Sequence, residues 1–150
     1  MVSTKDIQKL RTESGFGIIE CKNALEKSKG DIKKAIEVLK KSGKMKAAKK
    51  ADRATEQGLV ECYVHDSRIG VLLEVNCETD FVARNDEFKD FVHDLAMQIA
   101  SMNPKDVLAL KKQAYIKDMD VTVEDLLNEK IGKIGENIQI KRFTRYELGE

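Results

Sequence analysis

The chain has 150 residues, of which 41% are hydrophobic and 35% are charged, with a net charge of +1. This composition is typical of a folded, highly charged protein and excludes a chain too polar to bury a core. The three cysteines form no CxxC pair, and no run is apolar enough for a signal core or a membrane span. We therefore expect a protein of a reducing, cytoplasmic compartment, with no membrane contact.

The charge is divided unevenly along the chain. Residues 1–57 carry 15 Lys and Arg against 8 Asp and Glu, whereas residues 58–150 carry 12 against 18. This division predicts two units with different surroundings. The basic first half permits contact with nucleic acid, but basic residues spread over helices usually form a solvated face.

Residues 1–40 are predicted to form a domain of three short helices. Ser3 opens the first helix with a capping-box-like pattern, the glycine-rich stretch 14–17 ends it, and Asp31 caps the third helix. Helical spacing predicts a small core of Ile7, Leu10, Cys21, Ala24, Leu25, Ile32, Ala35, Ile36 and Leu39. Residues 41–56 are rich in lysine and lack a wide apolar face, so we expect a basic linker with nascent helix.

Residues 57–150 are predicted to form an α+β core. Alternating patterns indicate strands at 58–65 and 69–75, and a last strand at 137–146. Asn85 is expected to cap a long helix that stops at Asn103-Pro104, and Thr122 to cap a shorter one. Residues 105–121 are ambiguous and partly helical. The expected fold is an antiparallel sheet of about three strands with helices packed on one face.

Features of an enzyme are sparse in this sequence. His65 and His93 lack a recognisable catalytic partner, and no phosphate-binding GxxxxGK[ST] loop occurs. Asp86, Asp90 and Asp94 share a helix face, which favours solvation over a metal site because hard metals need oxygens from several directions. We expect no covalent catalysis, no cofactor and no metal.

Two features suggest RNA. The sequence Gly132-Lys133-Ile134-Gly135 is a GxxG with lysine, as in loops that clamp an RNA backbone, although a glycine-mediated helix end is the simpler interpretation. The lysine-rich linker is able to contact phosphates but lacks interleaved aromatics for base stacking.

The segment between the second strand and the long helix is the best candidate site. It comprises Asn76, Cys77, Glu78, Thr79, Asp80, Phe81, Val82, Ala83, Arg84 and Asn85. If a helix starts at Asp80 with Thr79 as its N-cap, Phe81 shares a face with Phe88 seven residues later and belongs to the core. Periodicity alone leaves core packing and partner binding both open.

This segment resembles the signature of the elongation factor Ts family. The matching stretches are LLEVNCE followed by TDFVARN at 72–85, SGFGIIECKNALEKSKGDIKKAIEVLKKSG at 14–43, KAAKKADRATEQGLV at 46–60 and GKIGENIQIKRFTRYELG at 132–149. The resemblance covers nearly the whole chain except 105–121. The order of the motifs makes it highly specific.

The resemblance implies a guanine-nucleotide exchange factor that removes GDP from elongation factor Tu, in a bacterium or an organelle matrix. It implies that the N-terminal helices resemble a ubiquitin-associated domain and dock on the partner's GTPase domain, with Arg11, Ile18 and Ile19 at the docking positions. Asp80 and Phe81 stand where the family inserts a wedge beside the magnesium site. The resemblance implies that the whole stretch from Thr79 to Asn85 binds the partner and takes part in exchange.

The chain also departs from the family pattern. Ile18 and Ile19 replace methionines that are common there, and the core has room for only one of the two related halves of long members. A three-stranded sheet with one helical layer exposes an apolar face, so we expect a two-fold homodimer that binds two partner molecules. The alternative function is an RNA-binding accessory protein of translation that uses the linker and the GxxG.

Overall fold

The computed structural model describes residues 2–150, which form two compact units. The first unit consists of the residues up to Ala51 together with residues 128–135. The second consists of residues 52–127 and 136–150. Each unit buries its own apolar residues.

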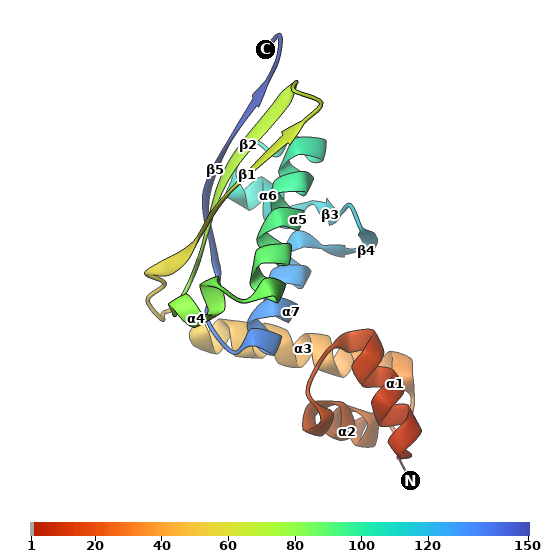
Figure 1. The fold of residues 1–150 in the computed structure, drawn as a ribbon. Helices are drawn as coiled ribbons and strands as arrows, with labels where there is room; N and C mark the ends of the chain where they lie inside the picture. Colours follow the sequence, from red (N-terminus) through yellow and green to blue (C-terminus); the bar gives the residue numbers. More distant parts are fainter. Residues whose placement is uncertain (1) are drawn as a thin grey trace. The chain divides into compact units, whose positions relative to one another are not determined.

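The first unit contains the three predicted N-terminal helices (Figure 1): α1 (Thr4–Ser14), α2 (Ile18–Lys27) and α3 (Ile32–Lys50). Ser3 Oγ accepts from the Asp6 N–H at 3.1 Å, and Asp31 Oδ1 accepts from the Lys34 N–H at 3.1 Å, so both predicted caps form. The buried core comprises Leu10, Phe16, Cys21, Ala24, Leu25, Ala35 and Leu39. Aliphatic packing therefore dominates this core, which contains one phenylalanine.

Helix α3 extends further than the sequence indicated. Residues 41–50 were expected in a linker, but they continue the helix and bury Gly43 and Ala47. The last turns of α7 (Val123–Ile134) belong to this unit and pack closely against that stretch: a Cβ on Gly132 would lie 3.1 Å from the Gly43 Cα. The buried face consists of small residues, which is why no apolar stripe was visible in the sequence.

The second unit is built on an antiparallel sheet of β1 (Gln57–His65), β2 (Ile69–Cys77) and β5 (Gln139–Glu147), in the order β1-β2-β5. The hairpin between β1 and β2 turns through Asp66 and Ser67, which both have positive φ. The three strands confirm the predicted α+β fold.

Helix α5 (Asp86–Met102) lies along one face of this sheet (Figure 1). It buries Phe88, Phe91, Val92, Leu95, Ala96 and Ile99 against the inward side chains Val71, Leu73 and Val75 of β2. Asn103 ends the helix in the left-handed conformation, with φ of 44°. The helix covers one face of the sheet, as the alternation in the strands predicted.

Residues 105–121, ambiguous in the sequence, form α6 (Val107–Lys112), β3 (Ala114–Tyr115) and most of β4 (Asp118–Thr122). Thr122 Oγ1 accepts from the Asp125 N–H and Asp125 Oδ2 accepts from the Thr122 N–H, both at 3.1 Å, so the predicted cap of α7 forms reciprocally. Among the helices of residues 2–150, none is long and apolar enough to cross a membrane.

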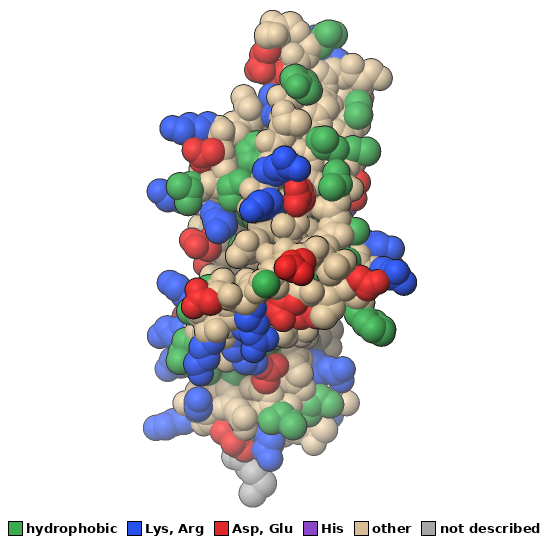
Figure 2. Space-filling view, turned by 90° about the vertical axis from the view of Figure 1, so that its left-hand side faces the viewer, with side chains coloured by type: hydrophobic (Ala, Val, Ile, Leu, Met, Phe, Trp, Pro, Cys, Tyr) green, Lys and Arg blue, Asp and Glu red, His purple; other side chains and the backbone are tan. Residues whose placement is uncertain are grey.

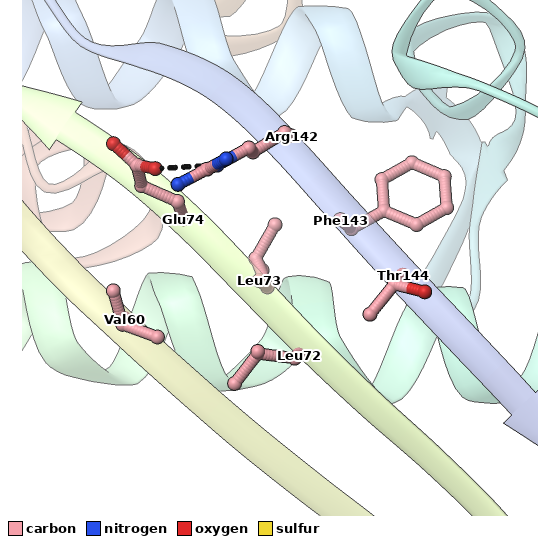
Figure 3. A pocket seen from close by; sticks show the side chains of 7 residues that line it. All are labelled: Val60, Leu72, Leu73, Glu74, Arg142, Phe143 and Thr144. Atoms are coloured by element: carbon pink, nitrogen blue, oxygen red, sulfur yellow. Dashed lines mark hydrogen bonds and ion pairs between the residues drawn. The ribbon is translucent and has the colours of Figure 1, made fainter.

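The face of the sheet turned away from α5 carries exposed apolar side chains. Val60, Val64, Leu72 and Tyr146 are each half exposed or more. Hydrophobic side chains gather on this side in Figure 2. A shallow hollow on it contains the ion pair of Arg142 Nε with Glu74 Oε1 at 2.9 Å (Figure 3). Apolar surface of this kind is typical of an interface.

Candidate functional site

The segment that follows β2 folds into a short helix, α4 (Asp80–Ala83). Thr79 has extended backbone angles and is its N-cap, because its Oγ1 accepts from the Val82 N–H at 3.4 Å. Asn85 then caps α5, with its Oδ1 accepting from the Glu87 N–H at 2.8 Å. Two successive caps separate α4 from α5, so the predicted site stands on a helix of its own.

Phe81 is the most exposed large hydrophobic residue among residues 2–150, with 89% of its surface accessible. Ala83, two residues further on, is only 6% exposed and packs α4 against the rest of the second unit. An exposed phenylalanine on a capped, anchored helix gains nothing from the fold of its own chain. This arrangement is typical of an anchor residue that inserts into a partner.

Asp80 does not cap α4, because Thr79 does. Its carboxylate forms an ion pair with the Arg84 guanidinium at 2.9 Å, and the Asp80 side chain remains 49% exposed. An exposed ion pair of this type contributes little to stability. Asp80 is therefore accessible to a partner, beside Phe81 in the first turn of α4.

One residue of this site escaped the sequence analysis. Glu136 lies 57 residues from Thr79 in sequence, yet its carboxylate accepts hydrogen bonds from the N–H groups of Glu78 and Thr79 and from the Thr79 hydroxyl. No motif or spacing signals such a contact. Only the pairing of β2 with β5 brings the two segments together.

Cys77 is buried at the end of β2, and its Sγ donates to the Thr79 carbonyl at 3.2 Å. Burial raises the pKa of the thiol to about 11, and the negative charge of Glu136 adds to this shift. The thiol is protonated at neutral pH and helps to hold the backbone before α4.

The predicted docking residues lie in the first unit. Arg11 is in the last turn of α1, and Ile18 and Ile19 form the first turn of α2. The two isoleucines are 55% and 74% exposed although the Phe16 side chain beside them is buried. The first turn of α2 thus presents two exposed apolar side chains.

The GxxG sequence does not form an exposed loop. Gly132 lies inside α7, where a Cβ would approach both Gly43 and the Phe16 ring, and only Gly135 follows the helix, with φ of +84°. Lys133 Nζ lies 5.8 Å from the centre of the Phe16 ring and pairs with Glu129 at 2.7 Å. The interpretation of this stretch as an RNA clamp is wrong because packing occupies the first glycine and the lysine.

His65 ends β1 and His93 lies on α5, and both are close to Tyr63. His65 Nδ1 is 3.0 Å from the Tyr63 hydroxyl, and His93 stacks edge-on against the Tyr63 ring. No group of three or more His, Cys, Asp or Glu able to hold a metal ion occurs within residues 2–150.

Comparison with known proteins shows which family the chain resembles. The elongation factor Ts family model matches residues 78–150, which include α4 and Glu136. Elongation factor Ts of Carboxydothermus hydrogenoformans is 42% identical over an alignment that covers 100% of this chain and 90% of that protein. The chain belongs to the elongation factor Ts family. It is therefore a translation elongation factor.

Other members of the elongation factor Ts family match over similar lengths. The protein of Moorella thermoacetica is 42% identical, with 100% of this chain and 97% of that protein covered. The protein of Thermotoga neapolitana is 44% identical, with 99% of this chain and 98% of that protein covered. The alignment with the Moorella protein spans 196 positions against 150 residues here, so that relative has residues within the aligned region that this chain lacks. This agrees with the interpretation of the chain as a short form.

Proposed function

We propose that this chain promotes release of GDP from elongation factor Tu, with Phe81 as the wedge that disturbs the nucleotide site. The observation that supports this most is the 89% exposure of Phe81 on a helix that is capped by Thr79 and anchored by Ala83. Within this family, such a side chain fits a partner better than a role in folding. Truncating an anchor of this type typically costs about 2–4 kcal/mol of binding free energy.

The wedge acts on the contacts that hold GDP. Nucleotide phosphates are bound by backbone N–H groups and by Mg²⁺, which offsets their charge. A ring inserted beside that site shifts the supporting elements and weakens both sets of contacts. Asp80 stands next to Phe81 with an accessible carboxylate, and we expect it to contact the same region.

Exchange requires that the factor prefer the nucleotide-free partner. By linkage, GDP weakens binding of the factor by the same ratio as the factor weakens binding of GDP. The factor makes and breaks no covalent bond, so it needs no catalytic residue or cofactor. We place this activity in the cytoplasm of a bacterium or in an organelle matrix.

Docking on the GTPase domain is assigned to Arg11, Ile18 and Ile19. The two isoleucines provide apolar contact and Arg11 provides a cation. Docking raises the local concentration of the wedge at its target without itself disturbing the nucleotide.

We further propose a homodimer formed through the outer face of the sheet, which binds two molecules of elongation factor Tu. The support is the exposed apolar row of Val60, Val64, Leu72 and Tyr146 opposite the helical layer. Sedimentation equilibrium at micromolar concentration should give twice the 17.0 kDa of the chain. Leu72→Lys should shift the mass to that of a monomer, and a monomeric wild-type chain would exclude the dimer.

The exchange function is tested by following fluorescent GDP bound to cognate elongation factor Tu after addition of the chain and excess unlabelled GDP. We expect the release rate to rise with chain concentration and then to saturate. An unchanged rate with a folded chain would reject the proposal. Salt-sensitive RNA binding in its place would favour the lysine-rich face of α3 as the functional surface.

A further inference from the structure

The carboxylate of Glu136 accepts three hydrogen bonds from the residues that lead into α4. Its Oε1 accepts from the N–H groups of Glu78 and Thr79, each at 3.0 Å, and its Oε2 accepts from the Thr79 hydroxyl at 2.7 Å. Hydrogen bonds to an ionised carboxylate are stronger than those between neutral groups. One side chain therefore fixes both the backbone and the hydroxyl of Thr79.

The orientation of that hydroxyl matters for α4. Thr79 Oγ1 gives its proton to Glu136 and turns a lone pair toward the Val82 N–H, the bond that caps the helix. A helix of four residues has almost no stability of its own. The direction of α4, and of Phe81 on it, therefore depends on this cap and on the buried Ala83.

The same junction is held from the other side. Glu78 Oε1 accepts from the Asn137 N–H at 2.7 Å and lies 3.5 Å from the Arg53 guanidinium. The Asn137 side chain donates in turn to the Arg53 carbonyl at 2.9 Å. The segments around Glu78 and Glu136 are thus joined by hydrogen bonds in both directions. The Arg53 guanidinium offsets part of the negative charge of the two glutamates.

We infer that Glu136 is a positioning residue for nucleotide exchange: it acts through Thr79 to hold α4 in the direction that presents Phe81. This inference rests on the proposed role of Phe81. A side chain fixed before binding loses less freedom when it inserts, so a larger fraction of encounters is productive. Loss of Glu136 leaves the docking surface unchanged and keeps the Phe81 side chain, but the direction of α4, and so of Phe81, becomes less ordered.

The test measures GDP release from elongation factor Tu as a function of factor concentration for Glu136→Ala, Glu136→Gln and Thr79→Val. We expect Glu136→Ala to lower the maximal rate about tenfold because three hydrogen bonds are lost. The half-saturating concentration should change by less than about twofold because docking is untouched. The maximal rate of Glu136→Gln should lie between those of the wild type and Glu136→Ala, since the amide oxygen still accepts from both N–H groups.

Two further measurements separate positioning from a general structural effect. Glu124, an exposed acid in the first turn of α7, provides the control, and Glu124→Ala should exchange GDP like the wild type. Hydrogen exchange of the Glu78 and Thr79 amides should be faster in Glu136→Ala while β1, β2 and β5 stay protected. Unchanged amide exchange would contradict the inference.

A double-mutant cycle links Glu136 to the wedge. If Glu136 acts through Phe81, then Glu136→Ala should have no further effect in a Phe81→Ala background. If Glu136→Ala lowers the exchange rate by the same factor in the wild-type and Phe81→Ala backgrounds, the inference is overturned. If Phe81→Ala exchanges GDP normally, the proposed function fails instead. If Glu136→Ala does not fold, full activity of Thr79→Val is the result that contradicts the inference.

Discussion

Phe81 and Phe88 lie seven residues apart, yet Phe81 is 89% exposed and Phe88 is completely buried. In one continuous helix, residues at this spacing share a face. The break between α4 and α5, where Asn85 starts a new helix, turns the two rings in different directions. The interpretation of Phe81 as a core residue is therefore wrong, and the ring is free to bind a partner.

Opposite effects are expected when the two rings are truncated. Phe81→Ala should leave the free energy of unfolding within about 0.5 kcal/mol of the wild type, since the ring makes little contact within the chain. Phe88→Ala should lower that free energy by about 3–5 kcal/mol because it leaves a cavity between α5 and the sheet. Urea denaturation measures both. A strongly destabilised Phe81→Ala protein would show that the ring packs in the fold.

The exchange assay should separate Phe81 from other exposed apolar residues. We expect Phe81→Ala to lower the rate of GDP release at least about tenfold, in line with the loss of a central anchor. Leu108 on α6 is also largely exposed and serves as the control, so Leu108→Ala should keep the wild-type rate. A similar loss in both variants would point to non-specific hydrophobic contact.

Docking and wedge insertion should differ in kinetics. The variant Ile18→Ala/Ile19→Ala should raise the half-saturating concentration for GDP release about tenfold and keep most of the maximal rate. Met45 on α3 is 63% exposed in the same unit, so Met45→Ala provides a matched control. A fall in maximal rate alone would place the isoleucines in the wedge step and remove them from docking.

The contact of α7 with α3 should be sensitive to a single side chain. In Gly132→Val the new Cβ would lie only 3.1 Å from the Gly43 Cα, which is closer than two carbon atoms normally pack. We therefore expect the free energy of unfolding to fall by about 1–3 kcal/mol. Gly70 has no heavy atom within 4 Å of such a Cβ, and Gly70→Ala should change stability little. Thermal unfolding of both variants provides the comparison. Equal stability of the two would show that the helices are able to separate.

Cysteine reactivity offers a test of the environment before α4. At pH 8 the Cys77 thiol, which is buried and has its pKa raised to about 11, should resist a disulfide reagent in the native protein and should react once urea has unfolded the chain. The pKa of Cys77 in the folded state exceeds the ordinary 9.0, so its contribution to the free energy of unfolding is fully present below pH 9. That contribution is lost as the pH rises toward 11. Cys77→Ala should therefore show a smaller loss of stability over that range than the wild type. Rapid native modification of Cys77 would contradict its burial.

The sequence predicted those parts of the fold whose patterns are local. Alternation marked β1 and β2, and capping residues such as Ser3, Asn85 and Thr122 marked helix starts. The two-residue β3 and the largely exposed β4 have no alternation to detect. The extension of α3 was missed because its buried face is made of Gly43 and Ala47, whose burial depends on packing by residues far along the chain.

The site was predictable only in part for the same reason. The resemblance named the stretch from Thr79 to Asn85, but the direction of Phe81 depends on a helix break that periodicity does not reveal. Glu136 carries no signal of its own, since its role arises from hydrogen bonds across 57 residues. Tertiary pairing of β2 with β5 creates this part of the site.

The central claim is most directly tested by release of fluorescent GDP from cognate elongation factor Tu with the chain present at one-tenth of the partner's concentration. We predict that the wild-type chain releases GDP from the whole partner population, which requires repeated turnover, and that Phe81→Ala does so at least about tenfold more slowly. Release limited to the spontaneous rate with wild type, or equal rates with wild type and a folded Phe81→Ala, would contradict the account.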